Sequence, residues 1–247
     1  MLRPLAVLAV VGPLALGVPQ AHAAGKQPAP VVQKSGAPPG APSAKTRSAA
    51  PARPRSAARA PKELGARIAT RASGLVGVSS LRKVDHSVPD DCTGVVRVAY
   101  ESAGIELMMG PGRTGSNGVT HIYQRAKQLG ALHKRRPQPG DLVFFRETYD
   151  RDRDGRRDDG LTHVAVVERV EADGSVIFVH RGSKGVARGR MNLSQPRIHR
   201  ARGSRAVVND YLRRASGGSR AYLTGELFAG YASPGPLAKA GTAAPLR

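Results

Sequence analysis

The sequence contains no tryptophan, and its ten other aromatic residues, four Phe and six Tyr in 247 residues, all lie at or after Tyr100. Acidic residues are equally uneven, because none occurs before Glu63. A segment without these side chains and rich in Ala, Pro and Gly buries too little apolar surface to offset the entropy of ordering it. We therefore expect no ordinary folded core in the first hundred residues and a compact domain behind them.

Long apolar runs are also missing. The longest uncharged apolar stretch, residues 4–18, is shorter than the ~20 residues of a membrane-spanning helix, so the sequence predicts no transmembrane segment. The stretch follows a basic start at Arg3 and precedes Ala21-His22-Ala23, a small-x-small cleavage pattern. The alternative, a buried apolar helix, is disfavoured because prolines interrupt the stretch. We expect residues 1–23 to be a cleaved signal peptide and the protein to be secreted or periplasmic.

Residues 24–61 contain seven basic and no acidic side chains among Ala, Pro, Ser, Gly and Gln, which predicts a disordered cationic linker. The chain has a net charge of +21, and eight positive charges lie before residue 60, which leaves +13 on residues 61–247. This surplus indicates an anionic partner: cell-wall polymer, lipid headgroups or nucleic acid. The expected signal peptide argues against nucleic acid and favours anionic cell-wall polymers.

Residues 62–232 carry the patterns of an α+β domain. Apolar spacing predicts helices over residues 63–75, from Asp90 or Asp91 to Gly104, and over residues 120–129. Strands are expected over residues 141–145, 162–170, 175–180 and 185–193, with Asp173-Gly174 as the hairpin turn between the middle two. N-terminal helices followed by an antiparallel β-sheet define the fold class. Residues 233–247 are rich in Pro, Gly and Ala and are expected to form a flexible tail.

Cys92 is the only cysteine, so an internal disulfide is excluded and a packing or a reactive role remains. It stands at the start of the second expected helix, where unpaired amides and the helix dipole stabilise a thiolate. Gly94 is expected to leave the thiol side open to substrate. The alternative is a small buried apolar residue.

A thiolate nucleophile needs a base, and that base needs an orienting group. His163 begins one expected strand and His180 ends the next, so the hairpin at Asp173-Gly174 brings both imidazoles toward the same end of the sheet. A bulge can move this register by a residue. His133 and His199 lie in basic, loop-like segments and are expected to be solvated.

Four motifs in series resemble those of the NlpC-type cell-wall cysteine peptidases, a papain-like family that acts on peptidoglycan stem peptides. The motifs are Asp91-Cys92-Thr93-Gly94, Pro139-Gly140-Asp141-Leu142-Val143-Phe144-Phe145, His163-Val164-Ala165-Val166-Val167 and Phe178-Val179-His180. The resemblance covers residues 64–192 and implies a papain-like fold.

The resemblance also implies roles for individual residues. Cys92 is expected to be the nucleophile, with its backbone amide as an oxyanion donor; His163 is the general base and then acid, and His180 orients it. Asp91 and Thr93 are expected to bind substrate. Such hydrolysis requires no cofactor, and its substrate is an amide bond of peptidoglycan.

The sequence leaves more than one candidate for the bond that is cleaved. Family members that cut beside γ-D-glutamyl have aromatic residues just before the nucleophile, whereas residues 78–90 of this chain have none. We expect a D,L-endopeptidase. The alternatives are an N-acetylmuramoyl-L-alanine amidase, as in the related CHAP-type domains, and a non-catalytic module of the same fold that binds the cell wall.

An acidic segment precedes the strand of His163. Carboxylates at positions one, three, five and nine of a calcium-type loop come from Asp150, Asp152, Asp154 and Asp158, and Gly155 occupies position six. Position twelve is Leu161 in place of the Glu of an EF-hand, so only a looser calcium loop, using Asp158 or Asp159, is expected. The alternative is a solvated loop in which four arginines neutralise five aspartates.

Overall fold

The computed structural model describes residues 55–110, 117–215 and 218–241. The expected signal peptide, residues 1–23, lies outside the described residues, as do residues 24–54 of the expected linker and residues 242–247 of the expected tail. Among the helices that the structure describes, none has the length and apolar character to cross a membrane.

The centre of the fold is a six-stranded sheet with antiparallel neighbours in the order β1-β8-β2-β3-β4-β5. Its strands are β1 (Leu132–His133), β2 (Leu142–Arg146), β3 (Leu161–Val170), β4 (Val176–Gly182), β5 (Gly185–Met191) and β8 (Phe228–Ala232). Strands β6 (Tyr211–Arg213) and β7 (Tyr222–Leu223) form a separate pair. The helices are α1 (Arg55–Ser73), the 3-10 turn η1 (Leu81–Lys83), α2 (Cys92–Glu101), α3 (Gly118–Gln128), α4 (Thr224–Leu227) and α5 (Pro234–Gly241). The predicted order of helices followed by an antiparallel sheet is confirmed.

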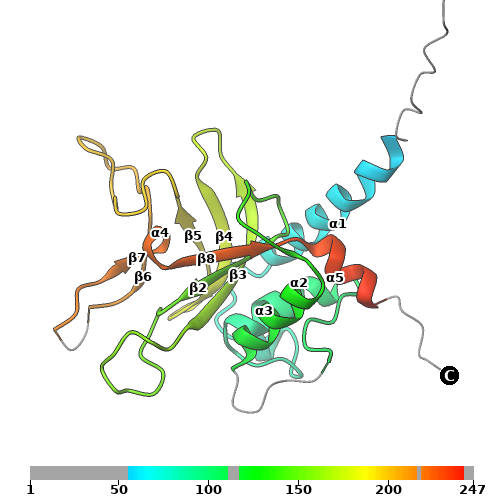
Figure 1. Cartoon of the computed structure of the whole chain (residues 1–247), viewed down its shortest axis with the longest axis horizontal. Helices are drawn as coiled ribbons and strands as arrows, with labels where there is room; N and C mark the ends of the chain where they lie inside the picture. Colours follow the sequence, from blue (N-terminus) through cyan, green and yellow to red (C-terminus); the bar gives the residue numbers. More distant parts are fainter. Residues whose placement is uncertain (1–54, 111–116, 216–217, 242–247) are drawn as a thin grey trace, which may run out of the picture. The chain divides into compact units, whose positions relative to one another are not determined.

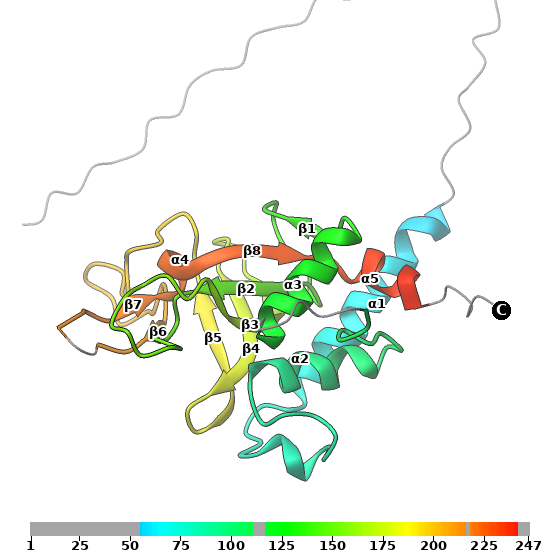
Figure 2. The ribbon, with the colours of Figure 1, turned by 60° about the horizontal axis from the view of Figure 1, so that its bottom comes forward.

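Both faces of the sheet are covered by apolar side chains. Figure 1 shows α1, α2, α3 and α5 on one side of the sheet and β6 and β7 on the opposite side, and Figure 2 shows the same separation after rotation. Along β2, Leu142 and Phe144 join the cluster packed with the helices, whereas Val143 and Phe145 join the cluster on the other face. Because successive side chains of a strand point to opposite faces, burial of both faces explains why this strand is one uninterrupted apolar run.

The prediction of a flexible tail from residue 233 was wrong over α5. Leu237 is fully buried, and α5 packs against α1. The proline content misled the interpretation, because proline is compatible with the first turn of a helix, where its missing N–H has no helical partner. Pro234 and Pro236 both lie in that turn.

The N-terminal predictions also need correction. Helix α1 begins at Arg55, so the linker prediction was wrong over residues 55–61, where alanine and arginine favour a helix. Residues before Tyr100 do contribute to the core: Ile68, Leu75 and Leu81 are fully buried in the cluster between helices and sheet. The segment before Tyr100 contributes aliphatic side chains to this cluster, whose aromatic members include Tyr100 and Phe144.

Candidate active site

Cys92 is the first residue of α2, and the residue before it caps the helix. Asp91 Oδ1 accepts hydrogen bonds from the Thr93 amide at 2.8 Å, the Gly94 amide at 3.1 Å and the Thr93 hydroxyl at 2.6 Å. An Asp at this position satisfies helix amides that otherwise have no partner. The cap therefore fixes the direction in which the half-buried Cys92 leaves the helix.

Gly94 has a different role from the one expected. A Cβ atom at this position would lie 1.9 Å from the carbonyl oxygen of Pro89 and 2.8 Å from Leu81 Cδ1. Glycine is therefore required because the segment before Cys92 crosses directly over the first turn of α2. The expectation that Gly94 opens the thiol side to substrate was wrong.

The acidity of Cys92 also differs from the expectation of a stabilised thiolate. Burial raises the pKa of the thiol to about 11, and the nearby Asp91 carboxylate raises it further, although amide hydrogen bonds from Val164, Cys92 and Thr93 act in the opposite direction. Desolvation disfavours the charged form and outweighs the helix N-terminus here. Cys92 is therefore a neutral thiol at neutral pH.

His163 and His180 are joined by a hydrogen bond. His163 lies opposite Phe145 of β2, His180 lies opposite Ala187 of β5, and the distance from His163 Nε2 to His180 Nδ1 is 3.0 Å. The pairing of β3 with β4 shifts register between Val167 and Arg169, which is the kind of bulge that was expected to be able to move the histidines by a residue. With this shift the two imidazole rings remain in contact. The residues of β3 that pair with β4 run from Val166 to Val170. His163 and His180 therefore lie just beyond the end of the paired segment.

Both histidines are uncharged at neutral pH. Burial lowers the pKa of His163 to about 3, and the neighbouring His180 lowers it further. Burial also lowers the pKa of His180 to about 4. A buried imidazole loses the hydration that stabilises its charged form.

Cys92 and His163 line the same open cavity of about 460 Å³. Among the described residues no hydrogen bond joins the Cys92 thiol to His163, whose Nε2 is directed to His180. Of the expected substrate-binding residues, Asp91 is exposed and lines this cavity, whereas Thr93 is buried with its hydroxyl bound to Asp91. The structure thus brings the nucleophile and base candidates to one cleft, with the third candidate behind the base.

The sequence analysis missed three residues of this cleft. Tyr149, from the loop between β2 and β3, supplies an aromatic side chain that residues 78–90 lack. Arg181 also lines the cleft and binds Asp90 through Nε at 3.0 Å, which holds the pKa of Asp90 well below its usual range. Asn117 caps α3 by accepting from the Thr120 amide at 2.8 Å. Only Asn117 had a sequence signal, as a capping residue before an apolar helix.

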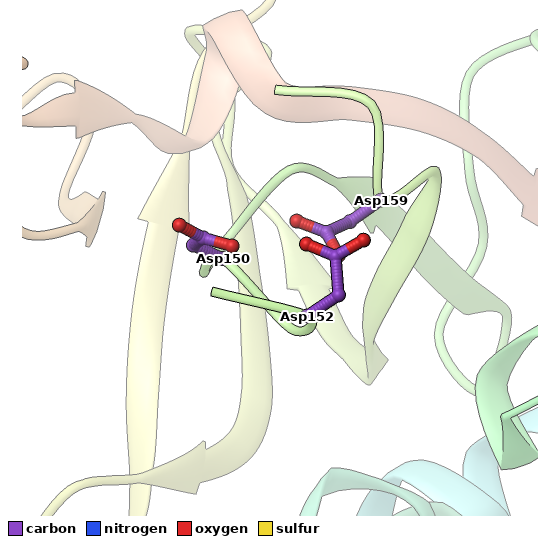
Figure 3. A group of neighbouring side chains, drawn as sticks. All are labelled: Asp150, Asp152 and Asp159. Carbon is purple, nitrogen blue, oxygen red and sulfur yellow. The ribbon is translucent and has the colours of Figure 1, made fainter. Parts of the chain in front are cut away.

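The acidic loop gathers its aspartates into two groups. Carboxylate oxygens of Asp150, Asp152 and Asp159 lie within 4.8 Å of one another, and Figure 3 shows these three side chains. The expected residues Asp154 and Asp158 form a second group with Asp152, and all three of these are exposed. Of the two alternatives that the sequence left open, Asp159 belongs to the partly buried group and Asp158 to the exposed one.

The two histidines expected to be solvated also have partners. His133 Nε2 lies 3.2 Å from Asp141 Oδ2, and its side chain is 9% exposed. His199 Nδ1 lies 2.8 Å from the carbonyl oxygen of Asn209. Basic surroundings in the sequence did not indicate exposure, because strand β1 and the loop after β5 pack against the sheet.

Comparison with protein families found a match over part of this domain. Residues 83–182 match the family model of the CHAP domain, and this match includes Cys92, His163 and His180. Comparisons with curated proteins and with solved structures found no match. CHAP domains are part of the NlpC and papain-like group of cysteine peptidases and amidases, so the resemblance inferred from the four motifs is confirmed. The domain indicates a peptidoglycan hydrolase, acting as an amidase or a peptidase.

Proposed function

We propose that this protein is a secreted or periplasmic D,L-endopeptidase that cleaves an amide bond of the peptidoglycan stem peptide with a cysteine nucleophile. The single observation that carries the proposal is the shared cleft of Cys92 and His163, together with the 3.0 Å contact between His163 Nε2 and His180 Nδ1. That contact leaves His163 Nδ1 as the ring nitrogen available to the thiol. In enzymes without substrate, catalytic hydrogen bonds are often long and shorten in the substrate complex.

The proposed reaction starts from neutral groups. For Nδ1 of His163 to accept a proton, Nε2 must carry the ring hydrogen, which it donates to His180 Nδ1. Nδ1 then takes the thiol proton as Sγ attacks the carbonyl carbon, and the Cys92 amide is the expected donor to the oxyanion. His163 passes this proton to the leaving amine, which leaves a thioester on Cys92. Attack of a water, deprotonated by His163, releases the acid and regenerates the thiol.

Recognition of the substrate is proposed to use groups around this cleft. The exposed Asp91 carboxylate is available to a substrate amine, and Tyr149 offers an aromatic side chain in the same cleft. The cationic residues 24–61 hold the enzyme near anionic wall polymers after export directed by residues 1–23. The thiol, the imidazole and the amide donor supply every group that this hydrolysis uses, so the proposed reaction includes no cofactor.

An N-acetylmuramoyl-L-alanine amidase is the second candidate, and the CHAP match over residues 83–182 favours it. Both reactions attack an amide carbonyl and use the same three side chains. They differ in the group that leaves: an amino acid or peptide for the endopeptidase, and a stem peptide with a free L-alanine terminus for the amidase.

Mass spectrometry of fragments released from purified peptidoglycan tests the proposal. The full chain is compared with Cys92→Ala, which removes the thiol at a half-buried position. New termini within the stem peptide are expected, and they must disappear in Cys92→Ala. Free L-alanine termini would favour the amidase, and fragments that persist in Cys92→Ala would exclude the thiol mechanism. A folded protein that binds the wall and releases nothing would be a binding module.

A further inference from the structure

We propose that the loop between β2 and β3 binds a calcium ion through the carboxylates of Asp150, Asp152 and Asp159. The three carboxylates offer oxygen atoms within 4.8 Å of one another. Two oxygens bound to the same calcium ion at about 2.4 Å are at most about 4.8 Å apart, so the cluster has the dimensions of a calcium site. This inference concerns binding and does not depend on the proposed reaction.

A buried oxygen without a partner distinguishes this cluster from a solvated acidic loop. The side chain of Asp159 is 1% exposed, and its Oδ2 has no hydrogen-bond partner among the described residues. The same is true of Oδ1 of Asp150, which is buried and has no partner in the described part of the chain. Carboxylates are rarely buried without compensation, because the lost hydration is costly. A cation between these two residues and Asp152 supplies that compensation.

The other oxygen of each buried carboxylate is already occupied by the loop itself. Asp159 Oδ1 accepts from the Arg151 amide at 3.0 Å, and Asp150 Oδ2 accepts from the Gly155 amide at 2.8 Å. These bonds set the orientation of the carboxylates and leave Oδ2 of Asp159 and Oδ1 of Asp150 for an ion. Figure 3 shows the carboxylate of Asp152 lying close to that of Asp159.

The arginines of the loop leave Oδ2 of Asp159 and Oδ1 of Asp150 without a hydrogen bond. Arg157 lies over the ring of Tyr222 at 3.9 Å from its centroid, and Arg156 Nε lies 3.9 Å from the exposed Asp154. Arg151 Nε is 3.9 Å from Asp159 Oδ1, which is beyond hydrogen-bond distance and on the oxygen that the amide already occupies. The ion pair of Arg151 with Asp159 therefore engages Oδ1 alone, and among the described residues Oδ2 of Asp159 and Oδ1 of Asp150 have no hydrogen-bond partner.

The stems of the loop hold the buried side of the cluster in place. Glu147 accepts hydrogen bonds from the amides of Asp159 at 3.2 Å and Gly160 at 2.8 Å, and the Thr148 amide donates to Thr162 Oγ1 at 2.8 Å. Oxygen ligands from side chains, with the remaining positions open to water and carbonyl groups, suit the flexible coordination of calcium.

Titration calorimetry of calcium chloride into the chelator-treated full chain tests the proposal. We expect one binding event with a dissociation constant of about 10⁻⁴ to 10⁻³ M, the range of extracellular calcium modules. Asp159→Asn and Asp152→Asn are each expected to weaken binding at least tenfold. Asp158→Asn is the matched control, because it removes an exposed carboxylate beside Asp159 and should change the affinity less than twofold.

Two results would overturn the site. The first is no heat of binding in the wild-type chain at calcium concentrations ten times above that range. The second is loss of binding in Asp158→Asn with retention in Asp159→Asn, which would place the ion on the exposed aspartates. Circular dichroism of each variant monitors folding. Because Asp152 is exposed, Asp152→Asn removes a proposed ligand and leaves the buried packing of Asp159 intact.

Discussion

At the ends of β3 and β4, the buried Nε2 of His163 has a partner in Nδ1 of His180 at 3.0 Å. In the loop between β2 and β3, Oδ2 of the buried Asp159 has no such partner among the described residues. Burial makes the histidine pair neutral, which removes the need for a counter-charge. A buried carboxylate oxygen without a partner has lost its hydration and gained no hydrogen bond in return. The histidine pair is complete within the chain, whereas the aspartate loop is the place for which we propose a cation.

The largest expected effect comes from disrupting the histidine pair by removing the proposed base, His163. His163→Gln is expected to reduce the release of peptidoglycan fragments about 10²- to 10⁴-fold, because general base catalysis contributes about that much. His180→Gln keeps a hydrogen-bond acceptor behind the base, so a smaller loss is expected.

The exposed His86 provides the matched control. His86→Gln removes an imidazole away from the histidine pair and should retain the wild-type rate. Fragment release is measured for each variant after circular dichroism has established its fold. A His163→Gln variant with the rate of the His86→Gln control would contradict the role assigned to His163.

Alkylation of Cys92 by iodoacetamide measures the acidity of the nucleophile directly. Because the thiolate is the reactive form and the pKa is raised to about 11, the rate should rise about tenfold per pH unit from pH 7 to 10. The chain has one cysteine, so the labelled mass reports this residue alone, and Cys92→Ala serves as the blank. A rate that is already at its plateau near pH 7 would mean that Cys92 and His163 form a thiolate–imidazolium pair.

The low pKa values of the histidine pair predict a pH-dependent stability. The unfolded chain takes up protons on both histidines below about pH 6.5, whereas the folded chain does so near pH 3 and 4. The unfolded state therefore binds more protons in this window, and the free energy of unfolding falls as the pH is lowered from 6.5 toward 4. The slope is at most about 1.4 kcal/mol per pH unit for each histidine.

Urea unfolding of the full chain and of His163→Gln from pH 7 to 4.5 measures this effect. The variant should have a smaller pH slope, because one of the two buried imidazoles is gone. His86→Gln, with an exposed side chain, should keep the wild-type slope. Equal slopes in wild type and His163→Gln would mean that other groups cause the pH dependence.

The same comparison shows why part of the site was predictable from sequence. The contact between His163 and His180 depends on one local hairpin, whose turn at Asp173-Gly174 has a clear sequence signal. Apolar spacing and turn residues predicted the order of the helices and central strands, and the structure agrees with it within a few residues. Strand β8, which inserts between β1 and β2, had no such signal, because its pairing is set by contacts distant in sequence.

The remaining errors have a common physical cause, which is burial. The spacing of the aspartates indicated a calcium loop and left Asp158 and Asp159 as alternatives, and only the structure shows that the side chain of Asp159 is the buried one. The helix position of Cys92 indicated a lowered pKa, and burial of the thiol reversed the sign. The spacing of residues in the sequence predicts which chemical groups a site contains. Which of these groups are shielded from solvent depends on the path of the whole chain.

The smallest expected effect connects the two regions through Tyr149, which lines the cleft of Cys92 and directly precedes the proposed calcium ligand Asp150. Calcium bound in the loop should restrict Tyr149 and the start of β3, two residues after Asp159. Removal of calcium is therefore expected to slow fragment release about fivefold, at the low end of typical coupling between sites. Asp158→Asn should respond to calcium as the wild type does, whereas Asp159→Asn should have the slower rate with or without calcium. An Asp159→Asn variant that keeps the full calcium response would contradict the coupling of the loop to the cleft, because the ion would then act on hydrolysis from another site.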